Sequence, residues 1–431
     1  MDVPDEDRFE QAIEDTDDRD ALLEAAWRCM PEGLRGIVSG TPIIPSVVTR
    51  AKLIASQNPD FIRSDQGQIV GVFPDKEIYY GPSAGIEKLR DLIARFWTHA
   101  YRLRDTHRFS TTGLHGENVS IVSGATEGLA IVLRIFAHNG NLGIMRFHWS
   151  NYPNLIRSAG GTPVVVDLFD ANYRMDLEAA ERTVTREKIT CLLINFPTNP
   201  SGDVLSREEI EHLARFAERL NLIIISDEVY SYLRYRGEPQ SMLAFAPERT
   251  VVISSASKEY LIPGARVGYV ISANRTFANA WIPKLIRSTS SSANVLGQRV
   301  LIDLLQEEVR DLERGRVPSK IAKIREELSA RRDLLISILK EHGFTLAGRD
   351  TDYPSGGISI LAKLPDNVAV DDVTFVEKAL SLKKFSAIPG SVFGAPGCLR
   401  FGYGGMPRDT IERLGRNLKE FLDVLQREAK Q

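Results

Sequence analysis

The sequence has few cysteines and no pattern of metal ligands. Three of its 431 residues are cysteine, namely Cys29, Cys191 and Cys398, and they lie far apart. This odd number argues against a disulfide framework, and the wide spacing argues against a zinc cluster. The seven histidines show no ligand spacing either. We therefore expect no metal site and a protein of the reducing cytoplasm.

Long apolar runs and an excess of one charge are also missing. No apolar run is long enough to span a bilayer, and the acidic residues 1–8 are unlike a signal or transit peptide. The net charge is −3 with no dense basic block, which argues against nucleic acid or a membrane as a partner. The hydrophobic fraction of 43% is typical of a globular enzyme with a sizeable core.

Apolar segments alternate with helical segments between about residues 118 and 273. The apolar segments are continuous rather than alternating with polar residues, which indicates strands that are covered on both faces. We therefore predict an α/β fold with a mostly parallel seven-stranded sheet covered by helices. Ligands bind such sheets at the carboxyl ends of the strands. The predicted strands are residues 119–122, 142–145, 162–166, 191–194, 222–225, 250–253 and 267–271.

The remaining chain predicts a second, smaller α+β domain. A charged helical pattern over residues 324–339 ends near Gly343, where glycine is a frequent helix terminator. We predict an acidic N-terminal arm, an N-terminal part of the small domain, a large cofactor-binding domain, and a C-terminal small domain with its linking helix. Their boundaries are residues 1–35, 36–65, 66–305 and 306–431.

The most informative stretch runs from Ser255 to Arg266 and contains Lys258. It follows the predicted strand 250–253, so Lys258 is poorly placed for a solvated charge. A desolvated lysine amine is a nucleophile that forms a Schiff base with an aldehyde. Hydroxyls of Ser255 and Ser257 and the guanidinium of Arg266 are suited to a phosphate on the same molecule.

A second strand end carries an acid and a phenol, Asp227 and Tyr230. The carboxylate suits a protonated pyridine nitrogen, and the hydroxyl suits an oxygen on the same ring. Aldehyde, phosphate, pyridine nitrogen and ring oxygen together describe pyridoxal 5'-phosphate (PLP). The alternatives are that Asp227 caps a helix and that Tyr230 packs in the core.

Further strand ends supply candidate contacts to the cofactor. Asn199 stands in a turn after strand 191–194 and can donate to the ring oxygen. Ser123, Gly124 and Ala125 open a helix, where free backbone N–H groups bind phosphate. Ordinary turns have the same composition, so each motif is informative only in combination.

Two more residues complete the candidate site. Trp149 is suited to stack on the cofactor ring, with Tyr152 as the competitor for that role. Arg400 is embedded in a predicted strand and could bind a substrate carboxylate through two parallel hydrogen bonds. A salt bridge to a protein acid is the alternative for Arg400.

Together these residues resemble the class I/II aminotransferases, which are fold type I among PLP-dependent enzymes. The resemblance covers residues 36 to 428, and its parts occur in the family's order. The matching segments are Tyr80-Gly-Pro-Ser-Ala-Gly85, Ser123-Gly-Ala-Thr, Trp149-Ser-Asn-Tyr, Asn199-Pro-Ser-Gly, Asp227-Glu-Val-Tyr230, Ser255-Ala-Ser-Lys258, Arg266-Val-Gly-Tyr and Pro389-Gly-Ser-Val-Phe-Gly before Arg400.

The resemblance implies a homodimer with shared active sites, in which Tyr80 reaches across to the phosphate in the other subunit. It also implies that Gly40 and Asn199 contact the substrate. Two departures stand out. Phe147 occupies the place of a proline that usually precedes the stacking aromatic by two positions. In addition, only Arg287 comes near the position of a second arginine for a dicarboxylic substrate, and it matches poorly.

We therefore predict a PLP-dependent aminotransferase acting on an α-amino acid and a keto acid, with Lys258 as the catalytic base. One alternative is another reaction of the same fold: elimination, replacement, cyclisation or oxidation. Pro263–Gly268 also resembles 1-aminocyclopropane-1-carboxylate synthases, which act on S-adenosylmethionine. The other alternative is a non-catalytic regulator with an aminotransferase-like domain, although residues 1–35 show no DNA-binding segment.

Overall fold

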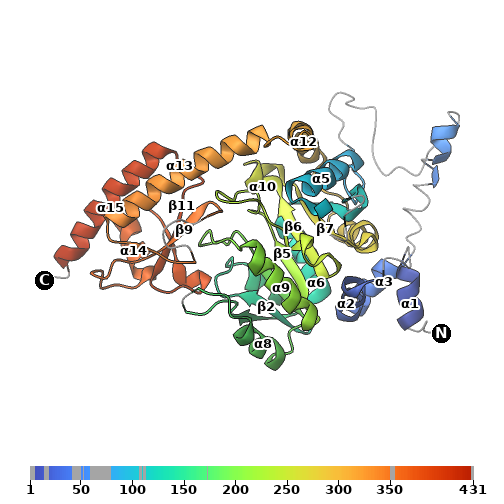
Figure 1. Ribbon diagram of the computed structural model, residues 1–431, viewed down its shortest axis with the longest axis horizontal. Helices are drawn as coiled ribbons and strands as arrows, with labels where there is room; N and C mark the ends of the chain where they lie inside the picture. The colour runs from blue at the N-terminus through green and yellow to red at the C-terminus, as the bar shows by residue number, and fades with distance from the viewer. Residues whose placement is uncertain are drawn as a thin grey trace.

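The computed structural model describes residues 5–13, 19–40, 50–58 except 52, 79–105, 109, 113–171, 173–349 and 355–428. The chain forms two lobes (Figure 1). We call the seven-stranded sheet with its helices the large lobe, and the four-stranded sheet with α13–α15 the small lobe. Long helices link the two lobes along one side of the molecule.

The large lobe contains a seven-stranded sheet with the order β1-β7-β6-β5-β4-β2-β3. β7 runs antiparallel to both of its neighbours, and the other neighbouring pairs are parallel. This confirms the predicted mostly parallel sheet. The strands are β1 (Val119–Val122), β2 (Asn141–Met145), β3 (Thr162–Val166), β4 (Cys191–Asn195), β5 (Ile223–Asp227), β6 (Thr250–Ser255) and β7 (Gly268–Ser272).

Six of the seven strands are buried on both faces, whereas the edge strand β3 is partly exposed. Successive side chains of a strand point to opposite faces, so Val251 and Ile253 of β6 join one hydrophobic cluster while Val252 joins another. This explains the continuous apolar runs in the sequence. The covering helices are α5 (Glu87–Ala100), α6 (Ala125–Phe136), α7 (Tyr152–Ser158), α8 (Leu177–Arg186), α9 (Arg207–Arg219), α11 (Ile282–Thr289) and α12 (Val295–Glu313).

The N-terminal helices pack against the large lobe. They are α1 (Asp5–Ala12), α2 (Ala21–Cys29) and α3 (Glu32–Ser39). Their rings join the core, since Trp27 lies 5.4 Å from Phe9 and 6.0 Å from Trp281 between centroids. The Trp281 indole N–H also donates to the backbone oxygen of Ala12 at 3.0 Å. The segment predicted as an arm therefore contributes its apolar side chains to the core.

The small lobe contains a four-stranded antiparallel sheet with the order β10-β11-β9-β8. It confirms the predicted smaller α+β part, while the four domain boundaries stay predictions. Aromatic rings fill its core, with Phe375 lying 5.0 Å from Phe421 and edge-on to it. The elements are α13 (Ser319–Glu341), β8 (Thr345–Leu346), β9 (Ser359–Lys363), α14 (Asp372–Ser381), β10 (Ile388–Pro389), β11 (Cys398–Gly402) and α15 (Arg408–Glu428).

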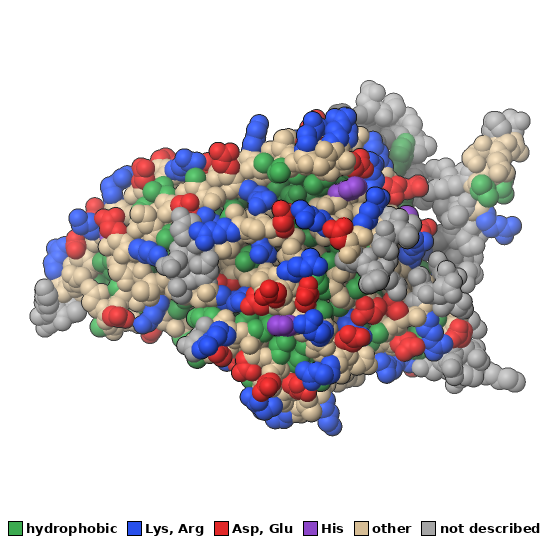
Figure 2. Space-filling view, viewed as in Figure 1, with side chains coloured by type: hydrophobic (Ala, Val, Ile, Leu, Met, Phe, Trp, Pro, Cys, Tyr) green, Lys and Arg blue, Asp and Glu red, His purple; other side chains and the backbone are tan. Residues whose placement is uncertain are grey.

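The surface carries charges of both signs. Figure 2 shows Lys and Arg side chains interspersed with Asp and Glu over both lobes, so the face in view has no extended field of one sign. Within the described residues, every helix is too short or too polar to cross a membrane.

Candidate active site

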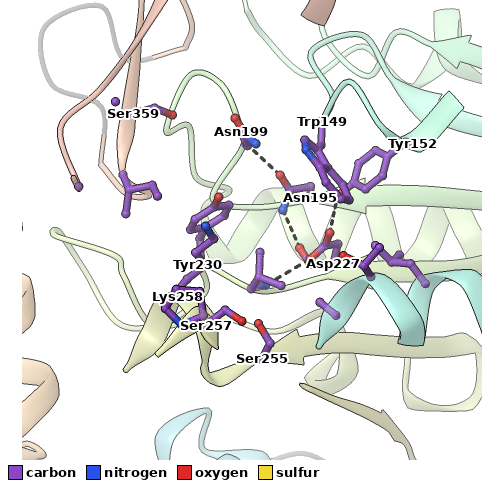
Figure 3. A pocket seen from close by; sticks show the side chains of 18 of the residues that line it. Trp149, Tyr152, Asn195, Asn199, Asp227, Tyr230, Ser255, Ser257, Lys258 and Ser359 are labelled. Carbon is purple, nitrogen blue, oxygen red and sulfur yellow. Dashed lines mark hydrogen bonds between the residues drawn. The ribbon is translucent and has the colours of Figure 1, made fainter. Parts of the chain in front are cut away.

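A cavity of about 370 Å³ lies where the two lobes meet, at the carboxyl ends of β4, β5 and β6 (Figure 3). Residues that are far apart in the sequence line it together, as the strand-end argument predicted. The predicted residues that line it are Ala125, Trp149, Asn199, Asp227, Tyr230, Ser255, Ser257, Lys258, Arg266 and Arg400.

Lys258 lies in the short helix α10 (Ala256–Glu259), directly after the fully buried strand β6. Burial lowers the pKa of its amine, and the positive charge of Arg400 lowers it further. A lowered pKa increases the fraction of neutral amine near neutral pH. The neutral amine is the form that attacks a carbonyl or accepts a proton.

Asp227 ends β5 and is 4% exposed. The Tyr152 hydroxyl donates to its Oδ2 at 2.5 Å, and the Val229 backbone N–H donates to its Oδ1 at 3.3 Å. Burial raises the pKa of Asp227 to about 6, although these hydrogen bonds act in the opposite direction. No α-helix begins directly after β5, so the helix-capping alternative does not apply. A buried carboxyl facing a cavity is suited to a positively charged N–H group.

Tyr152 and Trp149 are perpendicular to each other, with ring centroids 5.6 Å apart. Tyr152 is buried and directs its hydroxyl to Asp227, while Trp149 is only partly buried. The sequence predicts Tyr152 only as a possible stacking ring, and this hydrogen bond leaves no local sequence signal. The contact joins the first residue of α7 to the last residue of β5, 75 positions apart, so only the three-dimensional structure reveals it.

Two asparagines connect Asp227 to Arg400. Asn195 donates its side-chain N–H to the backbone oxygen of Asp227 at 2.8 Å, and its Oδ1 accepts from the Asn199 backbone N–H at 2.9 Å. Asn199 Oδ1 in turn accepts from Arg400 Nη1 at 3.2 Å. Sequence reasoning did not select Asn195, although it also ends a buried strand and the same argument could have found it.

Arg400 reaches the cavity from β11 of the small lobe. Its guanidinium lies 5.0 Å from the centre of the Phe393 ring, and its Nε is buried with no hydrogen-bond partner among the described residues. Burial lowers the pKa of Arg400. Among the residues with described positions, no acid forms a salt bridge with Arg400, so that alternative is not observed there. An unpartnered guanidinium N–H beside a cavity fits a carboxylate ligand.

Arg266 forms one wall of a polar cradle next to the start of α6. Its Nη2 donates to the Ser123 backbone oxygen at 3.1 Å. Gly124 has φ +83°, and a Cβ there would lie 2.4 Å from Arg266 Nη2, so only glycine fits. The first N–H groups of α6 after Gly124 have no partner within the helix. This geometry is suited to a phosphate.

Four predicted residues do not line this cavity. Ser123 and Gly124 lie next to it at the Arg266 cradle, whereas Tyr80 and Gly40 are not brought to it. Tyr80 is 78% exposed, and Gly40 is exposed at the end of α3. Neither lines the cavity as far as the described part of the chain forms it. For Tyr80 the resemblance implies a contact with the other subunit, whereas the single chain places Gly40 away from the proposed substrate site.

A two-lobed α/β fold with a half-buried lysine and an arginine with an unpartnered Nε between the lobes defines the class of fold-type-I aminotransferases. The chain belongs to the aminotransferase class I and II family, whose model matches residues 75–418. This confirms the predicted family and the transferase class. The eliminating, cyclising and regulatory alternatives are not favoured, because the named relatives are aminotransferases.

Curated relatives match most of the chain. It is 29% identical over 350 residues to the aspartate/prephenate aminotransferase of Thermus thermophilus, covering 81% of this chain and 83% of that protein. It is 30% identical over 353 residues to the aspartate aminotransferase of Thermotoga maritima, covering 81% of this chain and 84% of that protein.

Solved structures of aspartate aminotransferases share the fold of this chain. A double mutant of Thermus thermophilus aspartate aminotransferase superposes with a TM-score of 0.69 at 25% identity, covering 89% of this chain and 88% of that one. The aspartate aminotransferase of Thermotoga maritima superposes with a TM-score of 0.68 at 26% identity, covering 89% of this chain and 98% of that one.

Proposed function

We propose that this aminotransferase binds PLP in the cavity between its lobes and transfers the amino group of an α-amino acid to a keto acid. The observation that carries the proposal is the buried Asp227 carboxyl, which faces the same cavity as Lys258 and the unpartnered Nε of Arg400. This set matches the three charged or reactive parts of the reacting complex: pyridine nitrogen, aldehyde carbon and substrate carboxylate.

The residues that would hold the cofactor fit its groups. Asp227 would pair with the pyridine nitrogen, Tyr230 and Asn199 would contact the ring oxygen, and Trp149 would cover the ring face. Lys258 would bind the aldehyde carbon. The phosphate would lie in the cradle of Arg266, where the other groups are those of Ser123, Gly124, Ala125, Ser255 and Ser257.

When bound, PLP supplies an electron sink that stabilises negative charge at the substrate Cα and carries the amino group between the two substrates. The protein must then move one proton. Lys258 Nζ would accept the proton from Cα and return it as an acid, which its lowered pKa favours. Asp227 would keep the pyridine nitrogen protonated by its negative charge, with Tyr152 and Val229 holding it in place.

Arg400 would orient the substrate. Two parallel hydrogen bonds from one guanidinium hold a carboxylate in one plane, and this fixes the position of Cα relative to Lys258. Asn199 accepts a hydrogen bond from Arg400 and would also contact the ring oxygen and the substrate, so it links the two subsites.

We also propose a homodimer with shared active sites, with the partner subunit's Tyr80 reaching the phosphate. The 78% exposure of Tyr80, together with the exposed Leu261, Leu296 and Val300, supports a surface covered by a second copy. The unpaired cysteines support a reducing compartment such as the cytoplasm. Gly40 stays a proposed substrate contact on the basis of the resemblance alone.

The experiment is a screen of α-amino acids with and without 2-oxoglutarate, with detection of the keto acid product. An aminotransferase forms the keto acid in repeated turnovers only when an acceptor is present. Repeated turnover without an acceptor would support the eliminating or cyclising alternatives instead.

A further inference from the structure

The loop that carries Asn199 is held by both lobes. We call residues 196–206, which connect β4 to α9, the Asn199 loop. The active-site cavity borders it at Asn199, and a second cavity of about 360 Å³ borders it at Phe196, Thr198 and Asp203. Most of the loop is buried, but Asn199 is only partly buried where it borders the active-site cavity. The polar contacts of the loop therefore help to fix where Asn199 lies.

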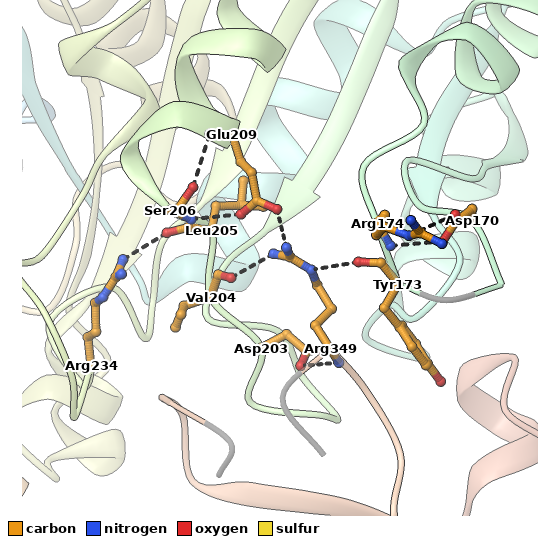
Figure 4. A network of polar contacts seen from close by, with 10 residues as sticks. All are labelled: Asp170, Tyr173, Arg174, Asp203, Val204, Leu205, Ser206, Glu209, Arg234 and Arg349. Carbon is orange, nitrogen blue, oxygen red and sulfur yellow. Dashed lines mark hydrogen bonds and ion pairs between the residues drawn. The ribbon is translucent and has the colours of Figure 1, made fainter. Parts of the chain in front are cut away.

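Arg349 makes the most extensive of these contacts (Figure 4). It follows β8 and so belongs to the small lobe. Its backbone N–H donates to Asp203 Oδ1 at 2.8 Å, and its Nη1 donates to the Val204 backbone oxygen at 2.8 Å. Its guanidinium also lies 4.4 Å from the centre of the Phe169 ring. Arg349 lines the second cavity and not the active site.

Glu209 links Arg349 to the start of α9. Its Oε1 pairs with Arg349 Nη2, while its Oε2 accepts from the Ser206 backbone N–H at 2.8 Å in the capping box of α9. The Arg349 and Glu209 side chains are only 17% and 19% exposed. One carboxylate thus joins the start of α9 to an arginine of the small lobe, in a place where water screens the pair little.

Two arginines of the small lobe therefore contact the same loop. Arg400 donates to the Asn199 side chain, and Arg349 donates to Val204, five residues further along. The position of the small lobe on this loop consequently sets the distance between Arg400 and the part of the site that the large lobe supplies. A misplacement by about 1 Å of a group that orients substrate can cost on the order of 100-fold in rate.

We infer that Arg349 is a positioning residue for the substrate-carboxylate site. It attaches the small lobe to the Asn199 loop and thereby fixes the position of Arg400 relative to Asn199. This inference rests on the proposed function. It adds that the affinity for carboxylate substrates depends on an ion pair outside the cavity.

The test compares Arg349→Met with two further variants and one control. Glu209→Gln removes the charge that faces Arg349 but keeps an acceptor for the α9 capping box. Arg234→Met is the matched control, because Arg234 Nη1 donates to the Leu205 backbone oxygen of the same loop from the large lobe. The third variant, Asn199→Ala, is made alone and together with Arg349→Met. Steady-state KM and kcat for the best amino acid, thermal midpoint and bound cofactor are measured for each.

We expect Arg349→Met to raise KM on the order of tenfold, Glu209→Gln to raise it less, and Arg234→Met to leave it within about twofold. Bound cofactor should not change. Adding Arg349→Met to Asn199→Ala should raise KM little further, because both act through one contact.

An unchanged KM for Arg349→Met with only a lower thermal midpoint would overturn the inference, as would an equal KM effect of Arg234→Met. If the unaltered enzyme transaminates no amino acid, the proposed function is wrong. That result is distinguishable from a failure of the inference on Arg349, which requires an active unaltered enzyme.

Discussion

Two pairs of neighbouring residues show how the cavity differs from the core behind it. Asp227 and Lys258 line the cavity, whereas Glu228 and Glu259, the next residues in the chain, lie buried away from it. Burial raises the pKa of Glu228 and of Glu259 to about 8, against about 6 for Asp227. Adjacent residues in the chain therefore have separate tasks, and acidity alone does not identify a catalytic group.

The two core acids also differ from the cavity residues in their partners. Glu228 Oε1 accepts from Ser226, Ser241 and the Met242 backbone N–H, while Glu228 Oε2 and Glu259 Oε1 have no hydrogen-bond partner in the part of the chain that the structure describes. Burial is the main cause of the raised pKa of both acids. We therefore expect both to be protonated at neutral pH and to affect stability rather than the reaction.

The largest expected effect separates Lys258 from Glu259. Lys258→Ala should lower kcat by at least about 10³-fold, because it removes both the covalent attachment and the base. Glu259→Gln keeps the shape of a neutral side chain and should retain kcat within about tenfold. Steady-state assays with the best amino acid check both. After borohydride reduction, mass spectrometry should find the cofactor on the Lys258 peptide of the unaltered enzyme. Labelling of another lysine would contradict the assignment.

The next comparison sets Asp227 against Glu228. Asp227→Ala should lower kcat on the order of 10²- to 10³-fold, because a preorganised charge next to the ring is lost. Asp227→Glu should cost less, and Glu228→Gln should cost little. The measurement is kcat at saturating substrate with excess cofactor. Equal losses for Asp227→Ala and Glu228→Gln would mean that the cavity-facing carboxyl has no special role.

A smaller effect separates Arg400 from Arg332, an arginine whose side chain is 3% exposed. Arg332 is paired with Asp333 and lies 4.6 Å from the Tyr235 ring centre, whereas Arg400 has an unpartnered Nε beside the cavity. Arg400→Lys should raise KM by the equivalent of about 1.5–3 kcal/mol, because lysine cannot form the two-pronged pair. Arg332→Lys should change the thermal midpoint and not KM. Both values come from one set of assays and melting curves, and an unchanged KM in Arg400→Lys would assign Arg400 a structural role.

The smallest effect concerns stability against pH. The pKa of Glu228 is near its ordinary 4.5 in the unfolded chain and about 8 in the folded protein. Its contribution to stability is complete below about pH 4.5 and is lost as the pH rises toward 8, since only the unfolded chain releases the proton in that window. Glu228→Gln should flatten this loss and raise the thermal midpoint at pH 8.5 by on the order of a few degrees relative to the unaltered protein. The control is the same comparison at pH 5, where the difference should be smaller.

The sequence alone predicted the strands of the large sheet and most of the candidate residues that line the cavity. The continuous apolar runs predicted seven buried strands, and the rule that ligands bind at strand ends predicted that Lys258, Asp227 and Asn199 share one edge of the sheet, as they do around the cavity. These predictions succeed because the covalent order of strand and loop fixes where a strand-end residue lies. Arg400 was predicted from its own strand segment, which belongs to the other lobe.

Contacts between distant segments could not be predicted in this way. Tyr152 reaches Asp227 through the packing of α7, and Arg349 stands in a loop without any motif. The acidic composition of residues 1–35 predicts an arm, and its boundary stays a prediction. The apolar stripe of α2 nevertheless buries Leu23 and Trp27 in the core.

The most direct test of the account is a single half-reaction. Enzyme loaded with PLP is mixed with its best amino acid in the absence of any keto acid, and both the cofactor spectrum and the products are followed. The account predicts one keto acid per active site, with conversion of the cofactor to its amine form, and recovery of the aldehyde form when a keto acid is added. The Lys258→Ala variant should show neither change. Repeated turnover of the amino acid without an acceptor would contradict transamination by this cavity.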